Sequence, residues 1–254
     1  WFTGLIAKIV TKLVREKENK KDKPFRLKYI EAGRLATPEL STEQAFKEII
    51  HFAHISRNGL GYARAAINES NPEKFEELRG KLVKYEEISD RIEYEIATFL
   101  NAVSSEEISA RTSMKIKSMY KIIGELESLG DSGESISRIL SRKNIHKKKF
   151  DDESIKNLNT MAKAVTDAYD VMIANLTAAH NGTLEEISNA YNAESNINTL
   201  RNNFREAAVE EIDNGNKNYQ TSVYYIDLMN EFERMGDYMI NISQDLERAF
   251  IRRQ

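Results

Sequence analysis

Two pairs of carboxylates with the same spacing are the residues of this 254-residue chain best suited to chemistry. Glu127 and Asp131 are four residues apart, and so are Glu233 and Asp237. Residues four apart lie on the same face of an α-helix. The first pair follows Ile123 at the same spacing, so we expect these carboxylates to continue an inward-facing row.

Like charges on one half-buried face need a cation. Without a partner, burial of such carboxylates costs several kcal/mol. The cation is either a metal ion or an Arg or Lys side chain from a neighbouring helix, and the sequence leaves both possibilities open. Carboxylates suit hard or borderline metals. The simpler alternative is that these acids are solvated or form ordinary salt bridges, as acids in charged helices usually do.

The segments around the two pairs are related copies. Residues 127–140 and 233–246 are identical at six of fourteen positions, at an offset of 106 residues. Gly130 and Gly236 match in the two copies, and glycine inside a helix usually marks a close approach of another helix. The pattern predicts a duplicated three-helix unit.

A second repeated pattern lies in the helix that precedes each pair. Glu86 and Asp90 are four residues apart and correspond to Glu194 and Asn198 at an offset of 108 residues. Glu86 and Asp90 could therefore complete a cation site with the first pair. Asn198 replaces an acid in the second copy, which predicts that one half-site binds metal poorly or has lost this property.

Composition and capping signals indicate an all-α protein. The chain has 3 prolines and 11 glycines, too few for the turns of a sheet protein of this length, and it has no cysteine for disulfides or thiolate metal sites. We predict six helices in two tandem three-helix bundles related by a pseudo-twofold repeat. The six predicted helices cover about 42–69, 72–103, 105–141, 152–180, 184–212 and 217–254. The residues expected to open the first five are Ser41, Asn71, Ser104, Asp151 or Asp152, and Thr183. The predicted domains are 1–25 (amphipathic and basic), 26–40 (linker), 41–150 (first repeat) and 151–254 (second repeat).

The N-terminal segment combines apolar and basic residues. Trp1–Val14 is mostly apolar but too short to span a bilayer, and Lys8–Lys28 carries nine Lys or Arg against three Asp or Glu. Apolar residues followed by basic ones are typical of the cytoplasmic end of a transmembrane helix. We therefore expect the native chain to extend before Trp1 and this segment to lie near an anionic membrane surface. The alternative is an ordinary amphipathic packing helix.

The rest of the chain is acidic, which argues against nucleic acid as a partner.

These motifs resemble those of a known family. The sequences ELESLGDSGESIS and ERMGDYMINIS are similar to the repeated E/DxxxD signature of the PhoU family. The sequence KYIEAGRLATPELSTEQAFKEI resembles the linker that joins membrane helices to a PhoU-like domain in bacterial sodium/phosphate cotransporter-family proteins.

The resemblance implies a regulatory, non-enzymatic domain at the cytoplasmic face of the cell membrane, belonging to a sodium-dependent phosphate transporter. Its implied partners are its own transmembrane transporter domain, phosphate-signalling proteins and a second copy in a homodimer. It also implies a transition metal, iron or zinc, on the carboxylates. The implied ligands are Glu127, Asp131, Glu233 and Asp237, with Glu86, Asp90 and Glu194 as weaker candidates.

Two other functions remain open. The first is a free-standing PhoU-like regulator of phosphate uptake. The second is a di-metal carboxylate enzyme of ferritin-like type, because Glu48 and His51 form an ExxH element. Such enzymes need two of these elements, and the chain has one, so we interpret His51 as a packing or surface residue.

Overall fold

The computed structural model describes residues 27–30 and 37–251 of the chain. These residues form six α-helices and no strand. The helices are α2 (Pro38–Asn68), α3 (Pro72–Ser104), α4 (Ala110–Ile145), α5 (Asp152–Asn181), α6 (Ser188–Asp213) and α7 (Tyr219–Phe250). The predicted all-α fold of two three-helix sets is confirmed. The predicted segment 1–25 lies outside the described residues, as do residues 26 and 31–36 of the predicted linker 26–40.

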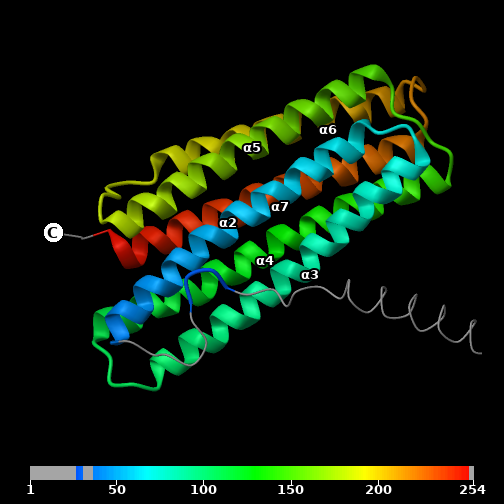
Figure 1. Cartoon of the computed structure of the whole chain (residues 1–254). Helices are drawn as coiled ribbons and strands as arrows, with labels where there is room; N and C mark the ends of the chain where they lie inside the picture. The colour runs from blue at the N-terminus through cyan, green and yellow to red at the C-terminus, as the bar shows by residue number, and fades with distance from the viewer. Residues whose placement is uncertain (1–26, 31–36, 252–254) are drawn as a thin grey trace, which may run out of the picture.

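The six helices run side by side along one long axis (Figure 1). Helices α2, α4, α7 and α5 contact one another in a closed ring. Helix α3 packs outside this ring on α2 and α4, and α6 packs outside it on α5 and α7. Each set therefore supplies two central helices and one outer helix, and the two sets meet through α4–α7 and α2–α5, as a pseudo-twofold repeat requires.

The apolar core lies inside the ring of four. Its largest fully buried side chains include Phe46 and Phe52 of α2, Tyr169 of α5 and Phe232 of α7. The outer helix α6 has only three buried residues, namely Ala190, Ile197 and Ala208. Among the described residues, no helix has a stretch that is apolar and long enough to cross a bilayer. The outer helices therefore present mostly polar faces, and the acidic motifs lie where they meet the ring.

Two predicted helix starts are wrong because the serines expected to cap them do not lie at the helix N-termini. Helix α2 begins at Pro38, with Thr37 as its N-cap, so Ser41 is buried inside the helix instead of capping it. Helix α4 begins after Ser109, whose hydroxyl accepts from the backbone N–H of Thr112. Ser104, the predicted cap, donates to the carbonyl of Leu100 and so ends the preceding helix.

The other turns follow the sequence signals more closely. Asn71 and Asp151 cap α3 and α5 with their side chains, as predicted. Gly182 ends α5 in the left-handed conformation (φ 72°), which glycine adopts without strain. Thr183, predicted to open the next helix, bonds instead to the last turn of α5, and α6 starts later at Ser188.

The matched glycines mark the closest approach of each outer helix to the ring. A Cβ atom at Gly130 of α4 would lie 2.6 Å from Ser89 Oγ and 2.8 Å from Ser89 Cβ on α3. A Cβ atom at Gly236 of α7 would lie 3.2 Å from Ile197 Cδ1 on α6. These contacts hold the α3–α4 and α6–α7 seams together beside the carboxylate pairs.

Candidate metal centre

Carboxylates from α3 and α4 converge at the seam of the first repeat. Glu86 and Asp90 of α3 and Asp131 of α4 each offer an oxygen, and the three oxygens lie within 4.8 Å of one another. Glu86 is half-buried, whereas Asp90 and Asp131 are exposed. The structure therefore brings together the three predicted residues from two helices, and a single cation could bridge them.

Two further carboxylates extend this cluster along the seam. Glu127 lies one turn before Asp131 on α4 and is half-buried. Glu93 of α3 faces the same seam, because a Cβ at Gly124 would lie 3.8 Å from Glu93 Oε1. The sequence reasoning missed Glu93 because this residue lies outside the four-residue spacing.

The electrostatics of this seam favour an added cation. Burial raises the pKa of Glu127 to about 7, and the charges of Asp131 and Glu93 add to this effect. Burial and neighbouring carboxylates likewise raise the pKa of Glu86, Glu93 and Asp131. Among the described residues, no Lys or Arg forms an ion pair with any of the five acids. A bound metal ion would relieve this repulsion, so the residues present fit a metal.

The equivalent seam of the second repeat is built differently. Arg201 of α6 places its Nη2 atom 2.6 Å from Glu233 Oε1 on α7, and both side chains are about one-fifth exposed. Asn198 donates a hydrogen bond to Glu194 on the same helix. Burial raises the pKa of Asp237, as do Glu233 and Glu194, while Arg201 lowers it. The guanidinium therefore supplies the cation here, and this seam does not fit a metal.

The sequence left open whether a metal ion or an Arg or Lys side chain neutralises the carboxylates, and the two seams differ on this point. Arg201 corresponds to Glu93 at the 108-residue offset that relates Glu86 to Glu194. One repeat thus presents an extra acid at the position where the other presents a protein cation. The same alignment of the repeats, carried three residues further, would have revealed both residues.

The ExxH element, Glu48 and His51, is not part of the carboxylate cluster. Glu48 is fully buried, and its Oε2 accepts the backbone N–H of Tyr29 at 2.6 Å. Glu48 and His51 belong to no cluster of three or more possible metal ligands in the described part of the chain. His51 instead makes an edge contact with the Tyr29 ring, as expected of a packing residue.

Comparisons with known proteins match this architecture. The PhoU domain family matches residues 158–246. The chain superposes on the phosphate transport system regulatory protein PhoU from Streptococcus pneumoniae with a TM-score of 0.68 and 15% identity, covering 83% of this chain and 95% of that one. It superposes on PhoU from Pseudomonas aeruginosa with a TM-score of 0.72 and 12% identity, covering 82% and 96%. No curated protein sequence matches the chain significantly. Residues 158–246 are therefore similar to the PhoU domain family, and the chain has a PhoU-like fold over 82–83% of its length.

Proposed function

We propose that this chain is a PhoU-like regulatory domain of phosphate transport, acting without catalysis of its own. The observation that carries the proposal is the match to PhoU: the PhoU fold spans 83% of the chain, and the PhoU domain covers residues 158–246. One of the similar structures is named as a phosphate transport system regulatory protein. A regulator of this kind works by binding partners and changing their state, and a helical bundle with an unneutralised acidic seam is suited to that role.

The proposal includes one transition-metal site, for iron or zinc, at the α3–α4 seam. Glu86, Asp90 and Asp131 would hold the ion, with Glu127 and Glu93 beside them. The ion would supply positive charge at the seam and hold the outer helix α3 against α4. We do not propose a metal on Glu194, Glu233 and Asp237, because Arg201 already pairs with this set.

We further propose that the domain is attached to the transmembrane part of a sodium-dependent phosphate transporter. Support comes from the sequence, where an apolar stretch, a basic stretch and a transporter-like linker precede the helices. This arrangement would hold the six helices at the cytoplasmic face of the cell membrane, with the basic residues near anionic lipid. The transporter domain would then be the partner whose state the bundle changes.

A free-standing PhoU regulator is the second candidate. It is favoured by one observation: the chain covers 95% and 96% of two solved PhoU chains, so its helices account for nearly a whole PhoU protein. In this case the partners would be phosphate-signalling proteins or a second copy of the chain.

Fractionation of the native host distinguishes the two candidates. An immunoblot against the six-helix region should detect a membrane band much heavier than 29.2 kDa if the transporter reading is right. A soluble band near 29 kDa would overturn that reading in favour of the free-standing regulator.

The regulatory role itself is tested by phosphate uptake. Deleting the coding region for residues 38–250 from the native gene should change the uptake of radiolabelled phosphate, or its dependence on external phosphate. Re-expression of the intact gene should restore the original behaviour. Unchanged uptake in the deletion strain, at both low and high phosphate, would contradict the proposed function.

A further inference from the structure

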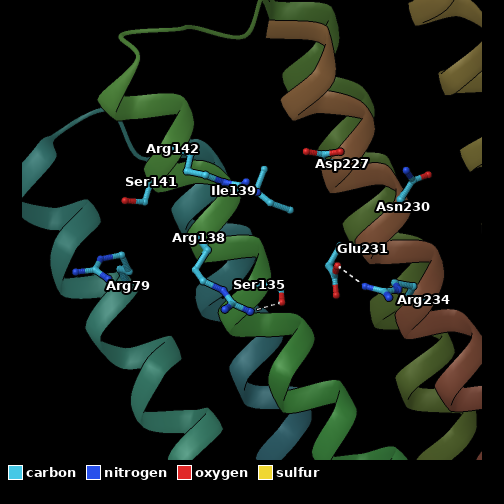
Figure 2. Close-up of a pocket in the computed structure, with 10 residues that line it drawn as sticks. All are labelled: Arg79, Ser135, Arg138, Ile139, Ser141, Arg142, Asp227, Asn230, Glu231 and Arg234. Atoms are coloured by element: carbon cyan, nitrogen blue, oxygen red, sulfur yellow. Dashed lines mark hydrogen bonds and ion pairs between the residues drawn. The ribbon is translucent and has the colours of Figure 1, made fainter. Parts of the chain in front are cut away.

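A groove of about 790 Å³ lies between α3, α4 and α7, away from the carboxylate cluster described above. Figure 2 shows Arg138 and Arg142 on α4 and Asp227 and Arg234 on α7, with Arg79 on α3 pointing away from α7. Four arginines line this groove against two acids, Asp227 and Glu231. Two of these arginines, Arg79 and Arg138, pair with Glu76 and Glu134 beside the groove at 2.8 Å.

The pseudo-twofold repeat places a sister groove elsewhere on the same α4–α7 seam. This second groove has a volume of about 650 Å³. Its α4 residues 120–128 correspond to α7 residues 226–234 of the first groove, at the 106-residue offset. Its α7 residues 238–248 correspond in the same way to α4 residues 132–142. The two grooves are thus copies of one structure, and their differences show what has changed since duplication.

The differences are in charge. Gln244 of the sister groove corresponds to Arg138, and Ser128 corresponds to Arg234, whereas Lys121 corresponds in the opposite sense to Asp227. The sister groove is lined by two basic and three acidic residues, whereas the first is lined by four basic and two acidic ones. Packing explains neither change, because Arg138 and Arg234 are 63% and 61% exposed.

The arginines of the first groove are available to a ligand. Within the described part of the chain, the side chain of Arg142 makes no hydrogen bond or ion pair. Arg138 pairs with Glu134 at 2.8 Å, and Arg234 contacts Glu231 at a long 3.4 Å. The guanidinium ends of these two pairs are open to a ligand, whereas their partners Glu134 and Glu231 are only 20% and 10% exposed.

We propose that this groove binds a small molecule that carries two or more phosphate groups, such as pyrophosphate or a nucleoside triphosphate. Guanidinium groups recognise phosphate through paired, charge-assisted hydrogen bonds. One phosphate would leave most of the groove empty, whereas its volume is typical of small-molecule sites, which hold roughly 300–1,000 Å³. Arg138 and Arg142 hold the phosphates, and the half-buried Asp227 accepts hydrogen bonds from ligand hydroxyl or amine groups.

The test is calorimetric titration of the full chain with pyrophosphate, ATP, inorganic phosphate and sulfate, in EDTA so that metal at the acidic seam plays no part. Pyrophosphate or ATP should bind, and binding should weaken as salt rises. The variant R138Q/R234S carries the sister groove's own residues and should bind at least about tenfold more weakly. The exposed substitution R142Q should do the same if the double variant fails to fold.

R248Q is the matched control, because Arg248 is the sister-groove counterpart of Arg142. This variant should bind as the unmodified chain does. Equal binding by R138Q/R234S and the unmodified chain would overturn the inference, and so would equal affinity for sulfate and pyrophosphate. Binding to phosphatidylglycerol vesicles without binding to soluble polyphosphates would also overturn it, since the groove would then contact a lipid surface.

Discussion

Arg201 Nη2 lies 2.6 Å from Glu233 Oε1, at the position where the first repeat carries Glu93. The residue at this one position, Arg201 in the second repeat and Glu93 in the first, thus determines whether the seam contains a protein cation for its carboxylates. The α6–α7 seam contains its own cation, whereas the acids of the α3–α4 seam have no protein cation paired with them in the described part of the chain. The two halves of a duplicated fold therefore differ in what they can bind.

Metal content should depend on the first seam alone. Elemental analysis of purified protein should find about one transition-metal ion per chain, because three carboxylate oxygens converge within 4.8 Å at only one seam of the described residues. E86Q/D131N should abolish this content. The matched variant E194Q/D237N should retain it, and loss of metal in that control would contradict the assignment.

Metal should also stabilise the fold, because an ion that binds only the folded state adds its binding free energy. At about 100 times the dissociation constant the gain is about 2.7 kcal/mol, or a rise in melting temperature of roughly 5–10 °C for a chain of this size. Thermal melts with and without zinc or iron(II) measure the shift. E86Q/D131N should show no shift, and an equal shift in this variant would place the ion elsewhere.

Stability without metal should fall as pH rises from about 5 to 8. The pKa of Glu127 is about 7 in the folded chain and near the ordinary value of 4.5 when unfolded. The folded state therefore binds more protons in this window, and stability is lost as the group ionises. E127Q should flatten the profile and raise the free energy of unfolding at pH 8 by about 1 kcal/mol, after allowance for solvent screening.

Urea unfolding at several pH values measures this profile in EDTA. Glu77 is an exposed acid on α3, the outer helix of this seam, so E77Q is the control and should leave the profile unchanged. A profile for E127Q with the same slope as the unmodified chain would show that Glu127 is not the group responsible.

Converting the second seam into the first should create a metal site. N198D/R201E gives α6 the acids that α3 has at Asp90 and Glu93. We expect this variant to bind a second metal ion and to be destabilised by about 1–3 kcal/mol in EDTA, because Glu233 loses its partner. R205E, one turn further along α6, is the control and should bind no extra ion. One ion per chain in both variants would mean that Arg201 does not determine the difference.

Gly130 should tolerate no side chain. Its Cβ would lie 2.8 Å from Ser89 Cβ, so G130A must push α3 away from α4 and should cost about 1–3 kcal/mol in unfolding free energy. G61A is the control, because nothing lies within 4 Å of that position, and it should stabilise α2 by up to about 1 kcal/mol. Chemical denaturation compares the two, and equal effects would show that the seam is not closely packed.

The sequence predicts the repeated elements well because they depend on local spacing. Six helices and the carboxylates at four-residue intervals follow from periodicity and from comparison of the two copies. Helix starts were less predictable, since Ser104 can either cap a helix or bond back to Leu100, and tertiary packing decides between them.

Alignment of the repeats could have found Glu93 and Arg201, but their position in the seams and the arginine groove could be seen only in the structure. Glu93 and Arg201 lie outside the repeated motif, and their importance depends on which side of the outer helix faces the seam. The groove combines α4 and α7 residues that are about 90 positions apart in the chain, so no local pattern indicates it.

The shallow burial of α6 has a consequence for local opening. With three buried residues and no side-chain cap at its start, this helix should have the lowest opening free energy among the helices described, and its amides should exchange hydrogen earliest. The Arg201–Glu233 ion pair holds α6 against α7 with a strength that does not depend on any added ion. With the proposed metal ion at the α3–α4 seam, the attachment of the opposite outer helix α3 would instead strengthen and weaken with the supply of that metal. The opening of one edge of the bundle would then be set by the sequence and the opening of the other by the surroundings.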